Sequence, residues 1–368
     1  MLVGIDASRA FVDRPTGTET YSRRVIEGLL APGSSHRYRL YCRSRPREGA
    51  FRGAELRVIR APRLWTHTRL AWEMMRQPPD LLFVPAHVIP PVRPRLSLVT
   101  VHDLGYLRFP EAHPWRQRMY LDLSTRWNAR ASTHILADSE ATKADLVARY
   151  STPPEKITVA YPGADRGLQP VGDHGVIESV KARYEIEDDY FLYLGTLQPR
   201  KNLVRLVDAY AHVVGRDPEI TAHLVLAGKH GWLYQELFDH VGRLGLRGRV
   251  LFPGYVADDD KAALLSGASA FVFPSLHEGF GLPVLEAQAC LCPVITSTTS
   301  SLPEVAGPGA LLVDPEDTSA IAEAMERVTT EPGLAGRLVQ QGTRNLMRFS
   351  WEKCARTILA VIDQVSAP

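Results

Sequence analysis

The sequence predicts an α/β protein made of two doubly wound domains in tandem, and three observations support this fold class. The chain has 368 residues, of which 45% are hydrophobic, whereas a single core rarely grows beyond roughly 250–300 residues. Short apolar runs alternate with amphipathic helical stretches along the whole chain. These runs are apolar on both faces, which is typical of buried parallel strands.

The first domain is expected over residues 1–168. Helical spacing covers residues 20–30 and 140–150. Buried strands are expected at residues 2–5, 37–42, 56–59, 81–84, 96–101, 134–137 and 157–160.

A Pro- and Gly-rich stretch interrupts the alternation, so residues 169–189 are expected to form a linker with a short helix near 176–184. The second domain is expected over 190–351, and the helix at about 352–368 is expected to pack back on the first. The strands of this second half of the chain are expected at 190–194, 222–227, 250–252, 270–273, 294–296 and 310–313. Its helices are expected at 203–214, 234–244, 259–266, 283–289, 318–329 and 336–364. Ligands of such sheets bind beyond the carboxyl ends of the strands, so the cleft between the domains is the expected site.

Composition and charge exclude several classes of protein. Lys and Arg number 43 against 41 Asp and Glu, a formal charge of +2, so a nucleic-acid binder that relies on bulk charge is not expected. The four cysteines make no disulfide scaffold and indicate a reducing compartment. Asp6 interrupts the first apolar run, and no stretch of about 18 apolar residues follows. We therefore expect a cytoplasmic protein without a transmembrane helix.

The stretch 43–76 is unusually basic and also carries tryptophan. A helix over 64–75 would have Trp65, Trp72 and Met75 on one face. We favour a surface helix whose Trp and Met side chains pack inward. The alternative is a peripheral contact with the cytoplasmic face of an anionic membrane.

The strongest chemical signal is the segment FPSLHEGFGLPVLE at 273–286. A strand leads into a loop in which Gly279 and Gly281 let the backbone approach a ligand closely. A helix then starts near Pro283, and its free N–H groups favour an anion such as phosphate. Glu278 and Glu286 flank this loop, and carboxylates of this kind bind the hydroxyl groups of sugars.

Two further signals also follow predicted strands. In YLGTLQPRKNL, Arg200 and Lys201 come shortly after a strand and Gly195, and both side chains bind phosphate well. In VTVHDL, His102 stands at the carboxyl end of the strand 96–101. The turn that contains Gly17 and Thr18 precedes the first helix and is expected to place backbone N–H groups near a ligand phosphate.

Taken together, these segments resemble the family 4 retaining glycosyltransferases of the GT-B fold, over nearly the whole chain. Gly17–Tyr21 looks like the family's glycine loop, and His102-Asp103 looks like its catalytic-loop histidine. Residues 195–202 look like its G-x-x-x-x-R-K-N segment, and Glu278 to Glu286 look like its E-x7-E motif. Residues 252–256, 263–274, 301–305 and 349–352 match it as well. The resemblance implies two Rossmann-like domains that face each other across a cleft.

The resemblance also implies roles for these residues. Arg200 and Lys201 neutralise the leaving diphosphate, Glu278 holds the donor sugar, and His102 lies beside the reacting carbon. Glu286 binds the ribose, and Tyr255 and Val256 lie near the base. The other implied donor-binding residues are Gly17, Thr18, Gly195, Gly279, Phe280, Gly281 and Leu282, and His87, Asp103 and Lys143 are assigned to the acceptor side.

The implied reaction moves a hexose from a nucleotide-diphosphate sugar with retention, without metal and without a cofactor beyond that co-substrate. The form GTLQPRKN looks like the mannosyl- and rhamnosyltransferase branch, so GDP-mannose is favoured over UDP-sugars and dTDP-rhamnose as donor. The favoured acceptor is a glycan on a polyprenyl-diphosphate carrier, with a soluble sugar or secondary metabolite as the alternative.

The sequence departs from the family pattern at three places, and it leaves other functions to be considered. Leu291 stands where relatives often have glycine, Lys143 is the basic residue of its segment, and Gly17-Thr18 has one glycine where many members have two. Asp258–Asp260 is expected to start a helix and not to bind metal. A nucleotide-sugar epimerase of this architecture and a non-catalytic sugar-nucleotide-binding subunit are the alternatives, whereas a dinucleotide oxidoreductase lacks its G-x-G-x-x-G.

Overall fold

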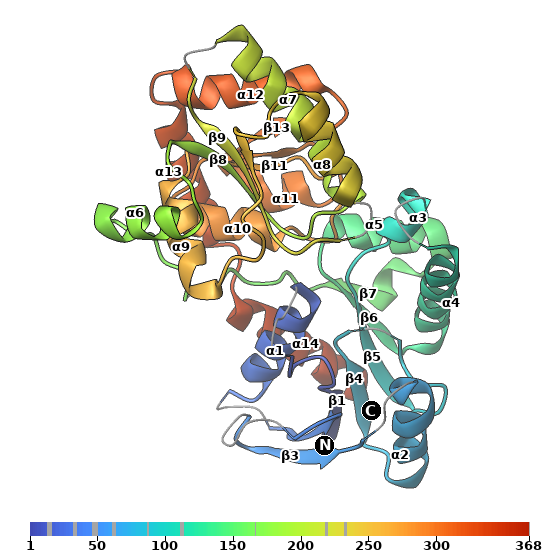
Figure 1. Ribbon diagram of the computed structural model, residues 1–368. Helices are drawn as coiled ribbons and strands as arrows, with labels where there is room; N and C mark the ends of the chain where they lie inside the picture. The colour runs from blue at the N-terminus through green and yellow to red at the C-terminus, as the bar shows by residue number, and fades with distance from the viewer. Residues whose placement is uncertain are drawn as a thin grey trace. The chain divides into compact units, whose positions relative to one another are not determined.

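The computed structural model describes residues 1–12, 17–31, 35–45, 51–60, 64–86, 88–110, 114–165, 167–217, 220–231 and 234–367. The chain divides into two compact units, shown in Figure 1. Unit 1 comprises Met1–Gly163 and Phe349–Pro368, and unit 2 comprises Ala164–Arg348. The stretch 169–189, expected as a linker, therefore lies in unit 2, where His174–Arg183 form helix α6.

Unit 1 is built on a seven-stranded parallel sheet with the order β3-β2-β1-β4-β5-β6-β7. The order reverses between β1 and β4, so chain crossovers lie on both sides of this point. The strands are β1 (Leu2–Asp6), β2 (Arg37–Cys42), β3 (Ala54–Val58), β4 (Leu81–Val84), β5 (Leu96–Val101), β6 (His134–Ala137) and β7 (Ile157–Val159).

The helices of unit 1 pack around this sheet, and α14 from the end of the chain packs against α1. Ser139 caps α5 by accepting a hydrogen bond from the Thr142 N–H, 3.1 Å away, as expected for serine at this position. The helical elements are α1 (Gly17–Leu29), the π-helical turn η1 (Thr66–Leu70), α2 (Ala71–Arg76), α3 (Gly105–Arg108), α4 (Trp115–Ala131), α5 (Glu140–Tyr150), the 3₁₀ turn η3 (Pro154–Lys156) and α14 (Trp351–Ser366).

Unit 2 repeats the architecture with a six-stranded parallel sheet in the order β10-β9-β8-β11-β12-β13. Helix α7 packs beside α12, and α10 packs beside α13. The strands are β8 (Tyr190–Leu194), β9 (His223–Ala227), β10 (Val250–Leu251), β11 (Ala270–Phe273), β12 (Val294–Ser297) and β13 (Ala310–Val313). The helical elements are α6, η4 (Pro199–Lys201), α7 (Leu203–Arg216), α8 (Tyr234–Arg243), α9 (Asp258–Gly267), α10 (Leu282–Ala289), α11 (Leu302–Ala306), η5 (Gly307–Gly309), α12 (Thr318–Thr330) and α13 (Leu334–Leu346).

The predicted fold class is confirmed, and the predicted strands all occur, but two helical predictions need correction and one long helix was missed. The expected helix over 336–364 is two helices, α13 and α14, because Ser350 caps a new helix start by accepting the Lys353 N–H at 3.1 Å. Helix α4 was not predicted. The prediction that Trp65, Trp72 and Met75 share an inward-facing apolar face is wrong, since Trp65 is buried whereas Trp72 and Met75 are 54% and 59% exposed.

Leu291 shows what its departure from glycine does to the backbone. It follows α10 with a φ of +59°, a left-handed conformation that costs a non-glycine residue about 1–2 kcal/mol. Its side chain is 45% exposed, so little packing energy compensates. Glycine is the common residue at this position after a helix.

Leu291→Gly is therefore expected to raise the free energy of unfolding by about 0.5–1 kcal/mol, after the entropy that glycine loses on folding. Urea unfolding measures the change. Leu312→Gly is the matched control, because Leu312 is similarly exposed in β13 without a positive φ, and it should lower stability. A loss of stability in Leu291→Gly would contradict the strain argument.

Within the described part of the chain, no helix combines the length and the hydrophobicity needed to cross a bilayer.

Candidate active site

Two loops meet at the carboxyl edge of the sheet in unit 2. Strands β8 and β11 are hydrogen-bonded neighbours, so the segments that follow them lie side by side. Turn η4 carries Arg200 and Lys201 after β8, and the loop before α10 carries Glu278 after β11. The Leu276 N–H donates to the Arg200 carbonyl at 3.0 Å, which fixes the two loops to each other.

Glu278 is the centre of a buried charge cluster in this edge. Its Oε1 accepts hydrogen bonds from Lys201 Nζ at 2.5 Å and from Ser275 Oγ at 2.5 Å, and its Oε2 lies 3.2 Å from an Arg200 nitrogen. Arg200 also donates to the His277 carbonyl. The Glu278 and Lys201 side chains are each 10% exposed, so two cations and one carboxylate share a small, largely dry volume.

The electrostatics of the cluster favour the ionised carboxylate. Burial alone would raise the pKa of Glu278, but Arg200 and Lys201 outweigh it and lower the pKa to about 2. Hydrogen bonds from Lys201 and Ser275 act in the same direction. The site therefore carries one net positive charge at neutral pH, which suits the binding of an anion.

Two serine side chains hold the backbone of the glycine-rich loop before α10 by hydrogen bonds. Ser301 Oγ donates to the carbonyls of Glu278 and Phe280, at 2.9 and 2.7 Å, and Ser300 Oγ accepts the Glu278 N–H at 2.9 Å. Gly281 has a φ of +112° and ends the loop at the first turn of α10. A Cβ there would lie 2.9 Å from a Leu302 methyl group, so the loop requires glycine at this point.

The remaining residues that the resemblance assigns to the donor lie in unit 2 as well. Glu286 on α10 forms an ion pair with Lys261 of α9 at 3.2 Å, and Leu282 is the first residue of α10. Tyr255 is 40% exposed, and the Lys229 Nζ lies 5.3 Å from its ring centre. Phe280 and Val256 are buried, Gly279 precedes Phe280 in the loop before α10, and Gly195 follows β8 with a φ of +156°.

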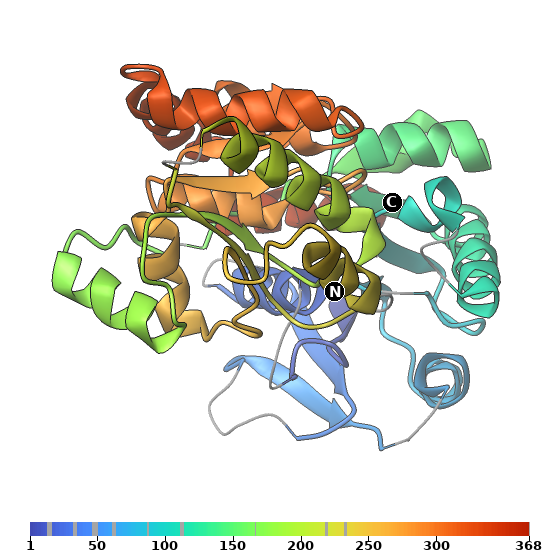
Figure 2. The ribbon, with the colours of Figure 1, turned by 45° about the horizontal axis from the view of Figure 1, so that its top comes forward.

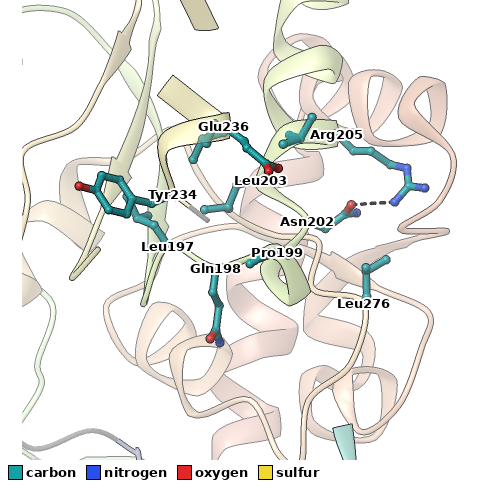
Figure 3. A pocket seen from close by; sticks show the side chains of 11 residues that line it. Leu197, Gln198, Pro199, Asn202, Leu203, Arg205, Tyr234, Glu236 and Leu276 are labelled. Carbon is teal, nitrogen blue, oxygen red and sulfur yellow. Dashed lines mark hydrogen bonds between the residues drawn. The ribbon is translucent and has the colours of Figure 1, made fainter. Parts of the chain in front are cut away.

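A cavity of about 370 Å³ adjoins this edge, and Figure 3 shows it. None of Arg200, Lys201 and Glu278 lines it, so the charge cluster and the cavity are separate features of unit 2. Its wall is mostly apolar and includes the Asn202–Arg205 hydrogen bond, 2.9 Å long and drawn as a dashed line. The lining residues are Leu197, Gln198, Pro199, Asn202, Leu203, Val204, Arg205, Tyr234, Glu236, Leu237 and Leu276.

His102 occupies the carboxyl edge of the sheet in unit 1. Its Nδ1 lies 2.6 Å from Asp138 Oδ2, and its Nε2 lies 3.0 Å from the Pro85 carbonyl oxygen. The ring of Tyr21 contacts it edge-on, with ring centres 4.9 Å apart. The imidazole is thus fixed by groups from three segments.

The other predicted residues of unit 1 that the structure describes lie in helices or at their starts. Gly17 and Thr18 begin α1. Asp103 Oδ1 accepts the Gly105 N–H at 2.9 Å and so starts α3. Lys143 is half-buried on α5. His87 lies outside the described residues.

Sequence reasoning missed three side chains of these sites. Ser275 lies two residues after the end of β11, and that position was a usable signal. Lys261 stands next to three aspartates in a helix start and gave no signal. Asp138 lies 36 residues from His102, and only the pairing of β5 with β6 brings the two together.

Among the described residues, no group of three or more His, Cys, Asp and Glu side chains is arranged to hold a metal ion. Asp258–Asp260 form the first turn of α9, as predicted, and Asp260 pairs with Arg183 at 2.5 Å. Their carboxylates serve the helix and this ion pair.

Comparisons with known proteins identify the family of the chain. Residues 15–167 match the family model described as Glycosyltransferase Family 4, and residues 177–345 match Glycosyl transferases group 1. O-antigen chain mannosyltransferase B from Escherichia coli is 30% identical over 298 residues, which cover 81% of this chain and 77% of that protein. Serotype-specific mannosyltransferase WbdA from Escherichia coli is 36% identical over 188 residues, 49% of this chain and 22% of that longer protein.

Solved structures share the fold over nearly the whole chain. Sucrose-phosphate synthase from Thermosynechococcus elongatus superposes with a TM-score of 0.79 at 22% identity, covering 99% of this chain and 98% of the other. HepE from Anabaena, in complex with UDP-glucose, has a TM-score of 0.76 at 18% identity and covers 99% of each chain. The two parallel sheets and the solved structures give the GT-B fold. Together with the two family matches and the mannosyltransferase relative, they show that the chain belongs to the family 4 glycosyltransferases of the GT-B fold.

Proposed function

We propose that this glycosyltransferase moves mannose from GDP-mannose to a glycan acceptor, with retention of anomeric configuration and without a metal ion. The single observation behind the reaction is the Arg200–Lys201–Glu278 cluster, whose net positive charge suits a leaving diphosphate. The names of the two Escherichia coli relatives favour mannose as the sugar. Those relatives are transferases, so the epimerase and the non-catalytic subunit are less favoured.

In this proposal unit 2 binds the donor. Arg200 and Lys201 stabilise the negative charge that develops on the diphosphate as the sugar leaves. The N–H groups at Phe280–Leu282 bind the same phosphates. Glu278 accepts hydrogen bonds from sugar hydroxyls, Glu286 binds the ribose, and Tyr255 and Val256 contact the base.

Two fixed cations replace the charge that a divalent metal would supply to the diphosphate. We therefore propose that the co-substrate itself is sufficient and that no cofactor is required. The residues that would otherwise suggest a metal, Asp258–Asp260, are engaged in α9 and its contact with Arg183.

The test is calorimetric titration of the protein with GDP, UDP and dTDP, followed by transfer assays with the matching sugars in the presence of EDTA. We expect GDP to bind in the micromolar range, Arg200→Ala to abolish this binding, and GDP-mannose to be consumed only when an acceptor glycan is present. Preferred binding of UDP or dTDP would overturn the assignment of GDP-mannose as the donor. Consumption without acceptor would favour the epimerase, and loss of activity in EDTA that metal restores would overturn metal independence.

The acceptor is proposed to be a glycan on a polyprenyl-diphosphate carrier, which requires contact with a membrane. Helix α4 carries Trp115, Met119 and Leu123, four residues apart on one stripe and 52–62% exposed. Tyr120 Oη on α4 contacts His67 of η1 at 3.1 Å, and Trp72 and Met75 of α2, which follows η1, are also exposed. Helices α2 and α4 lie at one edge of unit 1 in Figures 1 and 2. The exposed arginines of α4 are Arg116, Arg118, Arg126 and Arg130.

An exposed apolar stripe among arginines is typical of helices that lie on anionic bilayers. We expect the protein to co-sediment with vesicles containing phosphatidylglycerol and not with pure phosphatidylcholine vesicles. Trp115→Ser with Leu123→Ser should abolish this binding. The control pair Val176→Ser and Leu312→Ser removes similarly exposed apolar side chains from unit 2 and should leave it intact. Equal sedimentation of all variants would remove α4 from the proposal.

A further inference from the structure

Both ring nitrogens of His102 face groups that accept a hydrogen bond. The Pro85 carbonyl oxygen, 3.0 Å from Nε2, can only accept, so Nε2 carries a proton. The Nδ1···Asp138 Oδ2 distance is 2.6 Å, and with Nε2 protonated a second proton must lie on this bond. The ring therefore has no free lone pair with which to take a proton from a substrate.

The pairing is set by the register of the sheet. Val101 of β5 lies opposite Ala137 of β6. The residues that follow them, His102 after β5 and Asp138 after β6, are therefore brought side by side. Thr142 Oγ1, from the first turn of α5, donates to the His102 carbonyl at 3.2 Å and fixes the backbone on the other side. The contact between ring and carboxylate is thus built into the fold.

The charge on the ring depends on two carboxylates. Burial lowers the pKa of His102, but Asp138, Asp103 and the Pro85 carbonyl together outweigh burial and raise it above the ordinary value. The other titratable groups that face the pair are Tyr21 on α1, beside the ring, and Cys354 on α14, beside Asp138. Burial raises the pKa of both, so both stay neutral.

Asp138 also keeps an oxygen that stability alone does not explain. Its Oδ1 is buried and has no hydrogen-bond partner among the described residues, and an unsatisfied buried acceptor costs about 1–3 kcal/mol. Burial raises the pKa of Asp138, and His102 is the partner that opposes this. The carboxylate is therefore oriented toward a single group, the imidazole.

We propose that Asp138 is the positioning residue that keeps His102 protonated at both ring nitrogens, so that His102 serves the reaction as a fixed positive charge and not as a base. This role in transfer rests on the proposed function. A ring in this state cannot remove the proton of the acceptor hydroxyl, so that proton must leave to another group.

The pH dependence follows from the direction of the pKa change. Because the folded pKa of His102 is raised, the doubly protonated ring is complete below the ordinary pKa of histidine and is lost as pH rises through the folded value. Activity should fall along this alkaline limb. Asp138→Asn removes the charge that raises the pKa, so the limb should move to lower pH.

The test is ¹⁵N NMR of the histidine rings in the full-length protein, without substrate, with His102 identified by its loss in His102→Gln. We expect the native ring to be doubly protonated beyond pH 6.5, the ordinary histidine pKa, and its midpoint to move to lower pH in Asp138→Asn. We also expect the kcat of Asp138→Asn to be about 10- to 100-fold below that of the native protein, an effect of the size seen when a carboxylate that orients a metal-bound histidine is removed. Asp145→Asn is the matched control, because Asp145 is a buried carboxylate of α5 that pairs with Arg108 at 2.7 Å.

The outcomes separate this proposal from the proposed function. A native ring that is neutral at pH 6.5, or a midpoint that Asp138→Asn and Asp145→Asn move equally, would overturn it. If Asp138→Asn does not fold, Asp138→Glu takes its place, since it keeps the charge and should retain the high midpoint. A native protein that shows the expected ring state but transfers no sugar would leave the His102–Asp138 pair intact and overturn the transferase proposal instead.

Discussion

Lys201→Ala is expected to lower kcat by about 100- to 1,000-fold, the usual effect of removing one preorganised group that stabilises developing charge. The Lys201 ammonium is buried, lies 2.5 Å from Glu278 Oε1 and 4.9 Å from the centre of the Phe273 ring. These contacts hold it in place before substrate arrives. Since the charge on the diphosphate grows as the sugar leaves, donor affinity should fall less than kcat.

Steady-state kinetics with the donor identified by titration measure this effect, and circular dichroism checks the fold. Lys181→Ala is the matched control, because Lys181 is also a 10% exposed lysine of unit 2 and pairs with Glu178 on α6, away from the charge cluster. It should leave kcat unchanged. A Lys201→Ala rate within threefold of the native rate would remove Lys201 from leaving-group stabilisation.

Glu278→Gln is expected to lower the free energy of unfolding by about 3 kcal/mol at pH 7. The pKa of Glu278 is lowered from 4.5 to about 2 in the folded protein, and each unit corresponds to about 1.36 kcal/mol. Removing the carboxylate also leaves Arg200 and Lys201 buried without their counter-charge, which is costly for a buried ion pair. Both arguments predict a loss of similar size.

The pH dependence of this loss has a defined sign. A carboxylate with a lowered folded pKa stabilises the protein above its unfolded pKa of 4.5, and this contribution is lost as pH falls toward about 2. The difference between Glu278→Gln and the native protein should therefore shrink between these values. Hydrogen exchange of the buried β8 and β11 amides measures it within the full chain.

Glu326→Gln is the control for this experiment, because Glu326 pairs with Arg216 at 3.2 Å with its side chain 28% exposed. Such pairs contribute about 0–1 kcal/mol, so the control should differ little from the native protein. Equal stability of Glu278→Gln and the native protein at pH 7, or a difference independent of pH, would contradict the electrostatic account of the cluster.

The predictions from sequence were most accurate where structure and chemistry are local. The segment 273–286 contains a buried strand, a glycine loop and a helix start in direct succession, so its geometry follows from neighbouring residues. The Arg200-Lys201 turn is of the same kind. That the two loops meet depends on β8 and β11 being neighbours, which the resemblance implied and the residues alone did not.

Two features lay beyond sequence reasoning for physical reasons. Hydrophobic periodicity assumes that apolar residues face the core, but the buried residues of α4 are Thr125, Asn128 and Ala129, so the helix was missed. The His102–Asp138 contact depends on the register of β5 and β6. Register is a property of the assembled sheet and not of either strand.

The place of α14 in unit 1 has a consequence for synthesis of the protein. The helix packs on α1, β5 and β6, and Cys354 Sγ donates to the Ala160 carbonyl, yet α14 is translated after all of unit 2. Unit 2 is one continuous segment, Ala164–Arg348, and is complete while the ribosome still holds the residues that unit 1 needs. On the ribosome we expect the second unit to become protease-resistant before the first, the reverse of the usual N-terminal-first order.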